Sequence, residues 1–324
     1  MKAIICEKYG PISQLQLQEV PDPTPAADEV LIQVHACSVN FPDTLIVQGL
    51  YQFKPPLPFS PGSDLAGTVL AFGEQVKGFK VGDEVVGFAT HGGYAEQAVL
   101  KANTCFPKPP GMDMVQAAAF MLAYGTSYHA LKDRANIKEG ETLLVLGAAG
   151  GVGLTAVELG HRMGARVIAA ASTNEKLEVC KSYGAEMTIN YAVEDLKEKL
   201  KELTNGKGVD VIYDPVGGAY SEPALRRMAW NGRYLVVGFA AGNIPKIPLN
   251  LPLLKGCQIV GVFWGSFAQR FPGRNLQNTM ELIQWFAEGK LKPQIHDTYP
   301  LAEAVRALED ILARKVKGKA VIIM

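Results

Sequence analysis

The chain has 324 residues, of which 48% are hydrophobic and 20% are charged, so it can bury one large core or two moderate ones. Lys and Arg together number 32, as do Asp and Glu, and this balance argues against nucleic acid or an anionic membrane as the principal partner. No signal-peptide pattern, no long apolar run and five widely spaced cysteines predict a cytoplasmic protein that does not span a membrane.

The order of elements predicts two kinds of architecture in one chain. Up to about residue 120, short segments such as EVLIQVHACSV and DLAGTVLAF are separated by Gly, Pro and Asp, as in a β-rich domain. From about residue 123, strand-like segments alternate with helix-length periodic segments, from TLLVLGA to CQIVGVF. This alternation predicts a parallel sheet covered by helices, and the tail adds two more helices and a last strand, KAVIIM.

The segment LVLGAAGGVGLTAVELG, residues 144–160, predicts a strand, a tight turn and a helix. Ala148, Gly150 and Gly153 stand where a G-x-G-x-x-G fingerprint has its three small residues. Glycines permit close backbone approach, and the helix N-terminus supplies free N–H groups, so the turn predicts a pyrophosphate site rather than an empty structural turn. The predicted contacts are Ala149, Gly150, Gly151, Val152 and Gly153.

The end of the second predicted strand, ARVIAA, indicates which dinucleotide binds. An acidic residue there would bind a ribose 2′-hydroxyl, but the strand runs into Ala-Ser-Thr-Asn, with Lys176 just beyond. Small hydroxyl residues and a cation suit a 2′-phosphate, which predicts NADPH as cofactor, held by Ser172, Asn174 and Lys176. The alternative is that Ser172 and Asn174 cap the helix that begins near residue 175.

Four segments, SVNFPDTLIVQGLY, PGSDLAGTV, GAAGGVG and YDPVGG, resemble the quinone oxidoreductase branch of the medium-chain dehydrogenase/reductase superfamily over nearly the whole chain. The resemblance implies an α/β fold, with a Rossmann doubly wound parallel sheet plus a GroES-like β-rich domain. It implies a GroES-like catalytic domain over 1–122 and 266–324 and a Rossmann domain over 123–265. Members reduce quinones or activated alkenes with NADPH, usually as homodimers or homotetramers.

The zinc alcohol dehydrogenases of the same superfamily carry metal ligands that this sequence lacks. By the resemblance, their catalytic-zinc positions fall at Asn40, at Ser63 and near Met121, with no Cys or His between Met112 and Tyr128. A catalytic zinc needs three converging His, Cys or carboxylate ligands. We therefore expect no metal site and a zinc-independent enzyme.

Two residues are expected to be catalytic. Asn40 resembles the Asn of quinone oxidoreductases and would donate its amide to the nicotinamide ribose or the substrate carbonyl; the alternative is a turn residue. Tyr51 falls where related enoyl thioester reductases carry a proton-donating tyrosine, so it is the expected general acid, with packing as its alternative and solvent as the other proton source. Leu45 replaces a second tyrosine frequent in bacterial relatives, which makes an apolar enone or enoyl-type substrate a real alternative.

Further cofactor contacts follow from the resemblance alone. Thr126 resembles the position that contacts the nicotinamide amide, with a helix cap as its alternative, and Tyr191 resembles an adenine-side tyrosine. The segments GFAAG and GVFWGSF resemble those that wall the nicotinamide side, although their aromatics could equally lie in a core or a dimer interface. The residues concerned are Gly238, Phe239, Phe263 and Trp264.

The predicted function is an NADPH-dependent, zinc-free oxidoreductase that transfers hydride to a quinone or a carbonyl-conjugated alkene. One alternative is an enoyl-thioester reductase of the same superfamily. The other is a non-catalytic NADPH-binding protein similar to crystallin-type relatives. The sequence does not specify the acceptor, because loops of unknown shape build its pocket.

Overall fold

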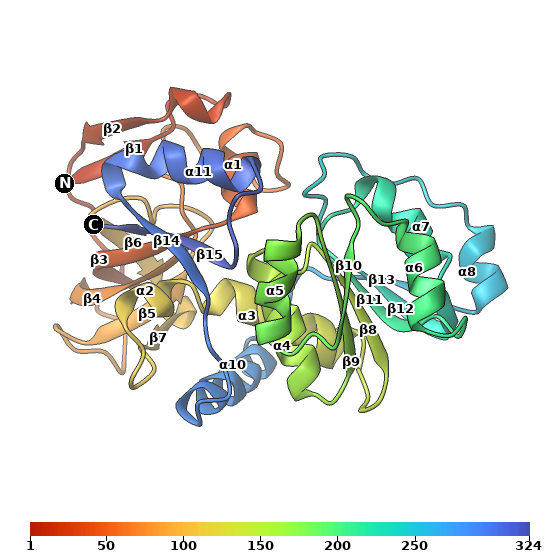
Figure 1. The fold of residues 1–324 in the computed structure, drawn as a ribbon. Coiled ribbons are helices and arrows are strands. Elements are labelled where there is room, and N and C mark those ends of the chain that lie inside the picture. Colours follow the sequence, from red (N-terminus) through yellow and green to blue (C-terminus); the bar gives the residue numbers. More distant parts are fainter. The chain divides into compact units, whose positions relative to one another are not determined.

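The structure, a computed structural model, describes residues 1–324 and divides the chain into two compact units (Figure 1). The first unit comprises Met1–Leu122 and Lys292–Met324, and the second comprises Ala123–Leu291. The expected boundary at residue 122 coincides with this division. The expected return to the first domain at residue 266 does not, because residues 266–291 belong to the second unit.

Polar contacts explain why the long helix α10 (Pro272–Ala287) belongs to the second unit. Glu281 accepts hydrogen bonds from Tyr128 and Lys132, and Arg274 forms an ion pair with the buried side chain of Asp133 at 2.7 Å. These contacts join segments about 150 residues apart in the sequence. The order of elements does not reveal them, and the domain limits expected from the sequence therefore differ here.

The first unit is built on a seven-stranded sheet in which only the β14–β15 pair is parallel. In β3, Val30, Ile32 and Val34 are buried and their neighbours are partly exposed, the period-two pattern of a strand that covers a core. The path across the sheet is β14 (Ile295–Pro300), β15 (Lys319–Ile323), β3 (Glu29–Val39), β4 (Asp64–Phe72), β5 (Glu84–Phe88) and β7 (Cys105–Pro107). Strand β6 (Gln97–Lys101) pairs with β3, and β1 (Lys2–Ile5) and β2 (Gln16–Glu19) form a separate pair.

Short helices cover this sheet. In α11 (Ala304–Leu312), Ala304, Ala307 and Leu308 are buried at the spacing of one helical face, and the helix contacts α1 (Phe41–Val47). The other helical segments of the unit are η1 (Ile12–Gln14), η2 (Ala102–Thr104), α2 (Met114–Ala118) and η5 (Leu301–Glu303). Helix α3 (Met121–Tyr128) begins as the first unit ends.

The second unit confirms the predicted parallel sheet. Its six parallel strands follow the order β10-β9-β8-β11-β12-β13, so the chain reverses direction across the sheet between β8 and β11. All of β8 is buried, as expected of a parallel strand covered on both faces. The strands are β8 (Thr142–Leu146), β9 (Arg166–Ala171), β10 (Met187–Asn190), β11 (Val209–Asp214), β12 (Met228–Val236) and β13 (Gln258–Gly261).

Helices lie on both faces of the parallel sheet. Figure 1 shows α4 (Gly151–Arg162) and α5 (Asn174–Ser182) on one face and α6 (Leu196–Leu203) and α7 (Ser221–Leu225) on the other. The remaining helices are η3 (His129–Arg134), η4 (Gly218–Tyr220), α8 (Asn250–Lys255) and α9 (Trp264–Arg270). All five cysteines are buried and unpaired in disulfides, and no helix of the chain has the length and apolarity needed to cross a bilayer.

The first turn of α4 packs against the turn that precedes it so closely that residue 153 has no room for a side chain. A Cβ atom on Gly153 would lie 2.2 Å from the carbonyl oxygen of Gly147 and 3.0 Å from Cα of Ala148. Both are backbone atoms, so only a shift of the whole turn could relieve the clash.

We expect Gly153→Ala to lower the free energy of unfolding by about 1–3 kcal/mol, although Ala is the better helix former. Gly150→Ala is the matched control, because the nearest atom to its Cβ would be 3.4 Å away and the protein should keep nearly wild-type stability. Thermal unfolding of the two variants measures the difference. Equal midpoints would contradict the steric argument.

Candidate functional site

In the second unit, candidate residues gather where the central parallel strands end. Gly147 follows β8 with a positive φ of 59°, Gly150 precedes α4, and the N–H of Gly150 donates to the oxygen of Gly147 at 3.0 Å. Gly151, Val152 and Gly153 form the first turn of α4, whose N–H groups have no partner within the helix. This arrangement suits an anion such as a pyrophosphate.

Two further turns pack beside the glycine turn. A Cβ on Gly147 would lie 2.7 Å from Val216 Cγ2, and a Cβ on Gly217 would lie 2.9 Å from Phe239 Cδ1. The turns after β8, β11 and β12 are therefore in close contact, and Phe239 lies among them with Gly238. The carboxyl edge of a parallel sheet, at the point where the strand order reverses, is where open α/β sheets bind ligands.

The buried side chain of Asp214 shapes the turn after β11. Its Oδ1 accepts from the backbone N–H groups of Val216 and Gly217 at 2.7 and 2.8 Å, and its Oδ2 accepts from Ser221 Oγ at 2.8 Å. The sequence analysis did not single out Asp214. A carboxylate at the end of an apolar strand, followed by Pro-Val-Gly-Gly, was the available signal.

Helix α3 is tied to the start of α4 through Ser127. The Oγ of Ser127 lies 2.8 Å from the oxygen of Val152, 2.8 Å from Thr155 Oγ1 and 2.9 Å from the hydroxyl of Tyr213. Thr126 precedes it inside α3, so the alternative role of a helix cap is wrong. The contact of Thr126 with a cofactor stays a prediction.

At the end of β9, Thr173 is the residue that caps α5. Its Oγ1 accepts from the N–H of Lys176 at 3.3 Å, so the interpretation of Ser172 and Asn174 as the caps is wrong. The Nζ of Lys176 donates to Ser172 Oγ at 3.4 Å. Both side chains therefore meet at the strand end, where the sequence predicted a phosphate site.

Two residues at the end of β10 are neighbours of this strand end: Asn190, the last residue of β10, and Tyr191, which follows it. The N–H of Tyr191 donates to the oxygen of Ala171 at 3.1 Å, and its ring lies 4.3 Å from the ring of Tyr220. The side chain of Asn190 donates to Asn174 Oδ1 at 2.8 Å. Sequence analysis had missed Asn190.

The two aromatic candidates after β13 differ in exposure. Trp264 is only 5% exposed, its Nε1 donates to Asn275 Oδ1 at 2.9 Å, and a Cβ on Gly125 would lie 2.7 Å from its ring. Trp264 therefore packs within the second unit, and its contact with a cofactor stays a prediction. Phe263 is 55% exposed.

In the first unit, a chain of hydrogen bonds surrounds Asn40. Asn40 follows β3 and precedes α1, and the register of β3 with β4 and β15 brings Ser38, Asp64 and Lys319 beside it. Lys319 Nζ donates to Asn40 Oδ1, Asn40 Nδ2 donates to Ser38 Oγ at 3.1 Å, and Ser38 Oγ donates to Asp64 Oδ2 at 3.1 Å. The bonds run in one direction from the ammonium to the carboxylate.

A second buried carboxylate, Asp43, holds the neighbouring segments. It accepts hydrogen bonds from the N–H of Asn40 at 2.8 Å and from the hydroxyls of Tyr94 and Ser63, each at 2.9 Å. Ser63 and Asn40, which stand at metal-ligand positions of the zinc enzymes, are thus engaged in hydrogen bonds within the protein. No group of three or more His, Cys, Asp or Glu side chains is placed to hold a metal ion.

Burial controls the protonation of this cluster. Burial raises the pKa of Asp64 to about 7, against the opposing effect of the Lys319 charge, and Asp64 Oδ1 has no hydrogen-bond partner. Burial also raises the pKa of Asp43 and lowers the pKa of Lys319, a residue that is only 5% exposed. The charged forms of all three groups are therefore costly.

Tyr51 is half-buried and packs against the core of the first unit. Burial, with the negative charge of Asp43, raises the pKa of its hydroxyl. The phenol therefore keeps its proton at neutral pH and can act as a hydrogen-bond donor.

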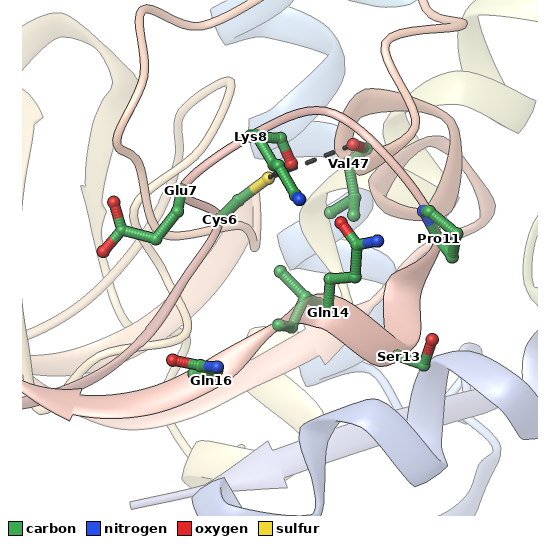
Figure 2. Close-up of a pocket in the computed structure, with 9 residues that line it drawn as sticks. Cys6, Glu7, Lys8, Pro11, Ser13, Gln14, Gln16 and Val47 are labelled. Atoms are coloured by element: carbon green, nitrogen blue, oxygen red, sulfur yellow. Dashed lines mark hydrogen bonds between the residues drawn. The ribbon is translucent and has the colours of Figure 1, made fainter.

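A cavity of about 400 Å³ also lies in the first unit, beside the N-terminal hairpin (Figure 2). Cys6 lines it, but the thiol donates to the oxygen of Lys8 at 3.3 Å, and burial raises its pKa. The thiol is therefore a poor nucleophile. None of the residues predicted to act in catalysis or cofactor binding lines this cavity.

Both units match known protein families. A family model described as "Alcohol dehydrogenase GroES-like domain" matches residues 26–110, and one described as "Zinc-binding dehydrogenase" matches residues 151–284. The chain is 39% identical over 324 residues to "Quinone oxidoreductase-like protein 2 homolog" of Nematostella vectensis, covering 99% of this chain and 88% of the relative. It is 34% identical over 330 residues to the human "Quinone oxidoreductase", covering 100% and 98% of the two chains.

The chain belongs to the quinone oxidoreductase-like branch of the medium-chain dehydrogenase/reductase superfamily. The Escherichia coli quinone oxidoreductase complexed with NADPH has a similar structure, with a TM-score of 0.93, 32% identity and full coverage of both chains. The structure of CurK enoyl reductase is also similar, with a TM-score of 0.89, 30% identity and coverage of 100% and 98%. The expected family, the GroES-like and Rossmann architecture and the general class of oxidoreductase are confirmed.

The pKa of Asp64 makes the stability of this quinone oxidoreductase-like chain depend on pH. Because Asp64 binds its proton more tightly in the folded than in the unfolded chain, its contribution to stability falls as the pH rises from about 4, the pKa of an unfolded Asp, to about 7, and then levels off. Between about pH 5 and about pH 8 this group alone should remove about 2–3 kcal/mol. Asp64→Asn should lack this loss, as measured by chemical denaturation at the two pH values.

Asp113→Asn is the control for removal of a carboxylate alone, because Asp113 is an exposed cap of α2 in the same unit. It should keep the wild-type slope. A wild-type slope in Asp64→Asn as well would show that Asp64 is ionised throughout this range.

Proposed function

We propose that the protein is an NADPH-dependent reductase that transfers hydride to a quinone or a carbonyl-conjugated alkene without a zinc ion. The observation that carries the proposal is the set of side chains at the end of β9, beside the glycine turn. Ser172, Asn174 and Lys176 offer hydroxyl, amide and ammonium donors, and the last residue of the strand is Ala171 rather than an acidic residue. Such donors fit a 2′-phosphate.

The second unit would hold the cofactor. The first-turn N–H groups of α4 suit its pyrophosphate, and the donors at the end of β9 suit its 2′-phosphate. When bound, NADPH supplies the hydride. Contacts of the cofactor with six further residues remain part of the proposal: Thr126, Tyr191, Gly238, Phe239, Phe263 and Trp264.

The first unit would stabilise the charge that develops on the acceptor. Addition to the β-carbon of an enone, or to a quinone, places negative charge on a carbonyl oxygen, which a hydrogen-bond donor stabilises. Tyr51 is our candidate for this donor and for the general acid, because its raised pKa keeps the hydroxyl protonated. Asn40 Nδ2 already donates to two oxygens of Ser38, Oγ at 3.1 Å and the backbone carbonyl at 3.4 Å, so a catalytic contact would replace one of these hydrogen bonds.

The absence of tight zinc ligands at the positions of the zinc enzymes supports a reaction that does not use the metal. Asn40, Ser63 and Met121 lack the thiolate, imidazole or carboxylate groups that bind zinc tightly. A hydrogen bond at the oxygen can stabilise the charge formed when hydride adds to a conjugated carbonyl, whereas the zinc enzymes use the metal as a Lewis acid in alcohol oxidation.

An enoyl-thioester acceptor is the second candidate, favoured by Tyr51 and by Leu45 in place of a tyrosine. A panel of quinones, enones and enoyl thioesters with NADPH distinguishes these acceptors. Tight NADPH binding with no turnover on any of them would favour the non-catalytic alternative. We also propose that the chain forms a homodimer or homotetramer, supported by the unpaired edge of β13 and by exposed apolar side chains on β12 and α8. A cytoplasmic location stays a prediction.

We expect Tyr51→Phe to slow reduction of the best acceptor by more than about tenfold, since general acid assistance is typically worth about 10²–10⁴ in rate. The ring is kept, so packing and NADPH affinity should change little. Stopped-flow oxidation of NADPH measures the rate. Tyr9→Phe is the control, because Tyr9 packs on the same core and its hydroxyl donates to Pro55. An unchanged rate in Tyr51→Phe would assign Tyr51 to packing and proton delivery to solvent.

Lys176→Ala should weaken NADPH binding by about 10- to 150-fold, since a charge-assisted hydrogen bond to phosphate is worth about 1.5–3 kcal/mol. NADH, which lacks the 2′-phosphate, should be nearly unaffected. Dissociation constants of both cofactors measured by fluorescence test this. Lys181→Ala removes the same charge from the same helix, where Lys181 pairs with Glu178, and should change neither constant. An equal loss for both cofactors in Lys176→Ala, or a wild-type preference for NADH, would contradict the cofactor assignment.

A further inference from the structure

The amide of Asn190 has one possible orientation. Asn190 ends β10 opposite Ala171 of β9, and only 8% of the residue is exposed. The backbone N–H of Ala192 donates to Asn190 Oδ1 at 3.2 Å. A backbone N–H can only donate, so this contact fixes the carbonyl oxygen of the amide on that side and its –NH2 on the other.

That –NH2 in turn fixes the amide of Asn174. Asn190 Nδ2 donates to Asn174 Oδ1 at 2.8 Å. If the Asn174 amide were turned by half a rotation, two –NH2 groups would face each other, and a hydrogen bond would be lost. The oxygen of Asn174 is therefore used within the protein, and its amide nitrogen is the group left for a ligand.

The Ser172 hydroxyl is also left as a hydrogen-bond donor, because of a different neighbour. Lys176 Nζ donates to Ser172 Oγ at 3.4 Å, so this oxygen accepts and its own hydrogen is left to donate elsewhere. The end of β9 therefore presents hydrogen-bond donors from Ser172, Asn174 and Lys176. Phosphate oxygens accept hydrogen bonds, whereas a ribose 2′-hydroxyl both donates and accepts, so this polarity favours the phosphate.

We propose that Asn190 is a specificity-determining positioning residue, which holds the Asn174 amide with its –NH2 available to the 2′-phosphate and so favours NADPH over NADH. This inference rests on the proposed function, in which the end of β9 receives that phosphate. Asn190 itself would not touch the cofactor. The Ala192 backbone N–H fixes the orientation of the Asn190 amide, and the Asn190 amide in turn fixes the orientation of the Asn174 amide.

Asn190→Asp tests the proposal by reversing the polarity. One carboxylate oxygen can still accept from Ala192, but the other can only accept from Asn174, which must then turn its –NH2 inward and its oxygen toward the ligand. We expect the dissociation constant of NADPH to rise at least about tenfold, the value of one charge-assisted hydrogen bond, while that of NADH stays the same or falls. Titration calorimetry with 2′-phospho-ADP-ribose and ADP-ribose gives the same comparison without turnover.

A double-mutant cycle separates amide orientation from the added charge. In an Asn174→Ala background no amide remains to be turned, so Asn190→Asp should raise the NADPH dissociation constant by less than about threefold. If the loss is the same in both backgrounds, the charge acts through space and the inference is wrong. An equal loss for both cofactors would show a merely structural role and would also overturn it.

Asn190→Ala covers the case in which the aspartate variant does not fold, since the new carboxylate lies near Glu194, whose Oε2 accepts from the N–H of Asn190. Without the bond from Asn190, the Asn174 amide can adopt either orientation, so the preference for NADPH should fall by roughly twofold or more. An unchanged preference in a folded Asn190→Ala variant would overturn the inference. A wild-type preference for NADH would instead overturn the proposed function, so the two failures are distinguishable.

Discussion

The close contact between the first turn of α4 and the turn at Gly147 organises the second unit. With only hydrogen at residue 153, the helix can begin immediately where β8 ends, and its N–H groups lie at the carboxyl edge of the sheet. The same lack of side chains at Gly147 and Gly217 lets the next two turns pack alongside. Close backbone approach at these glycines sets the geometry of the edge, and the buried Asp214 side chain holds the turn after β11 in place.

Backbone groups of this kind bind an anion without distinguishing one dinucleotide from another, because the pyrophosphate is common to both. Discrimination requires side chains of defined polarity one strand away. At the end of β9, neighbouring groups determine which side-chain atoms can donate. The Ala192 N–H orients the Asn190 amide, which orients the Asn174 amide. Lys176 orients the Ser172 hydroxyl in the same way. Side chains able to donate or accept become donors because their other atoms are already engaged.

The first unit handles polarity differently, by burying charge. Lys319 and Asp64 are linked through the neutral side chains of Asn40 and Ser38. Burial raises the pKa of Asp64 and lowers the pKa of Lys319. Asn40 and Ser63, two of the three positions that correspond by resemblance to metal ligands of the zinc enzymes, here belong to a hydrogen-bonded cluster. Burial raises the pKa of its carboxylate Asp64 to about 7, so we expect this cluster to make stability depend on pH.

Local sequence was sufficient to predict elements whose signals lie within a few residues. The glycine turn, the alternation of strands and helices after residue 123 and the β-rich character of the first part all depend on periodicity and on backbone freedom, which neighbouring residues determine. The family resemblance added the two-part architecture and the positions of Asn40 and Tyr51. The capping residue of α5 was misjudged by one position, because Ser172, Thr173 and Asn174 are all good caps and only backbone geometry selects among them.

The rest was decided by the tertiary structure. Lys319 is 279 residues from Asn40 in the sequence, and only the pairing of β15 with β3 brings them together. Asn190 meets Asn174 because β10 lies beside β9, and helix α10 belongs to the second unit because its polar side chains reach Tyr128, Lys132 and Asp133. A residue's type and its sequence neighbours determine what it can donate or accept. Sheet register and helix packing determine which partner it meets, and that choice depends on segments too distant in the sequence for any local pattern to encode.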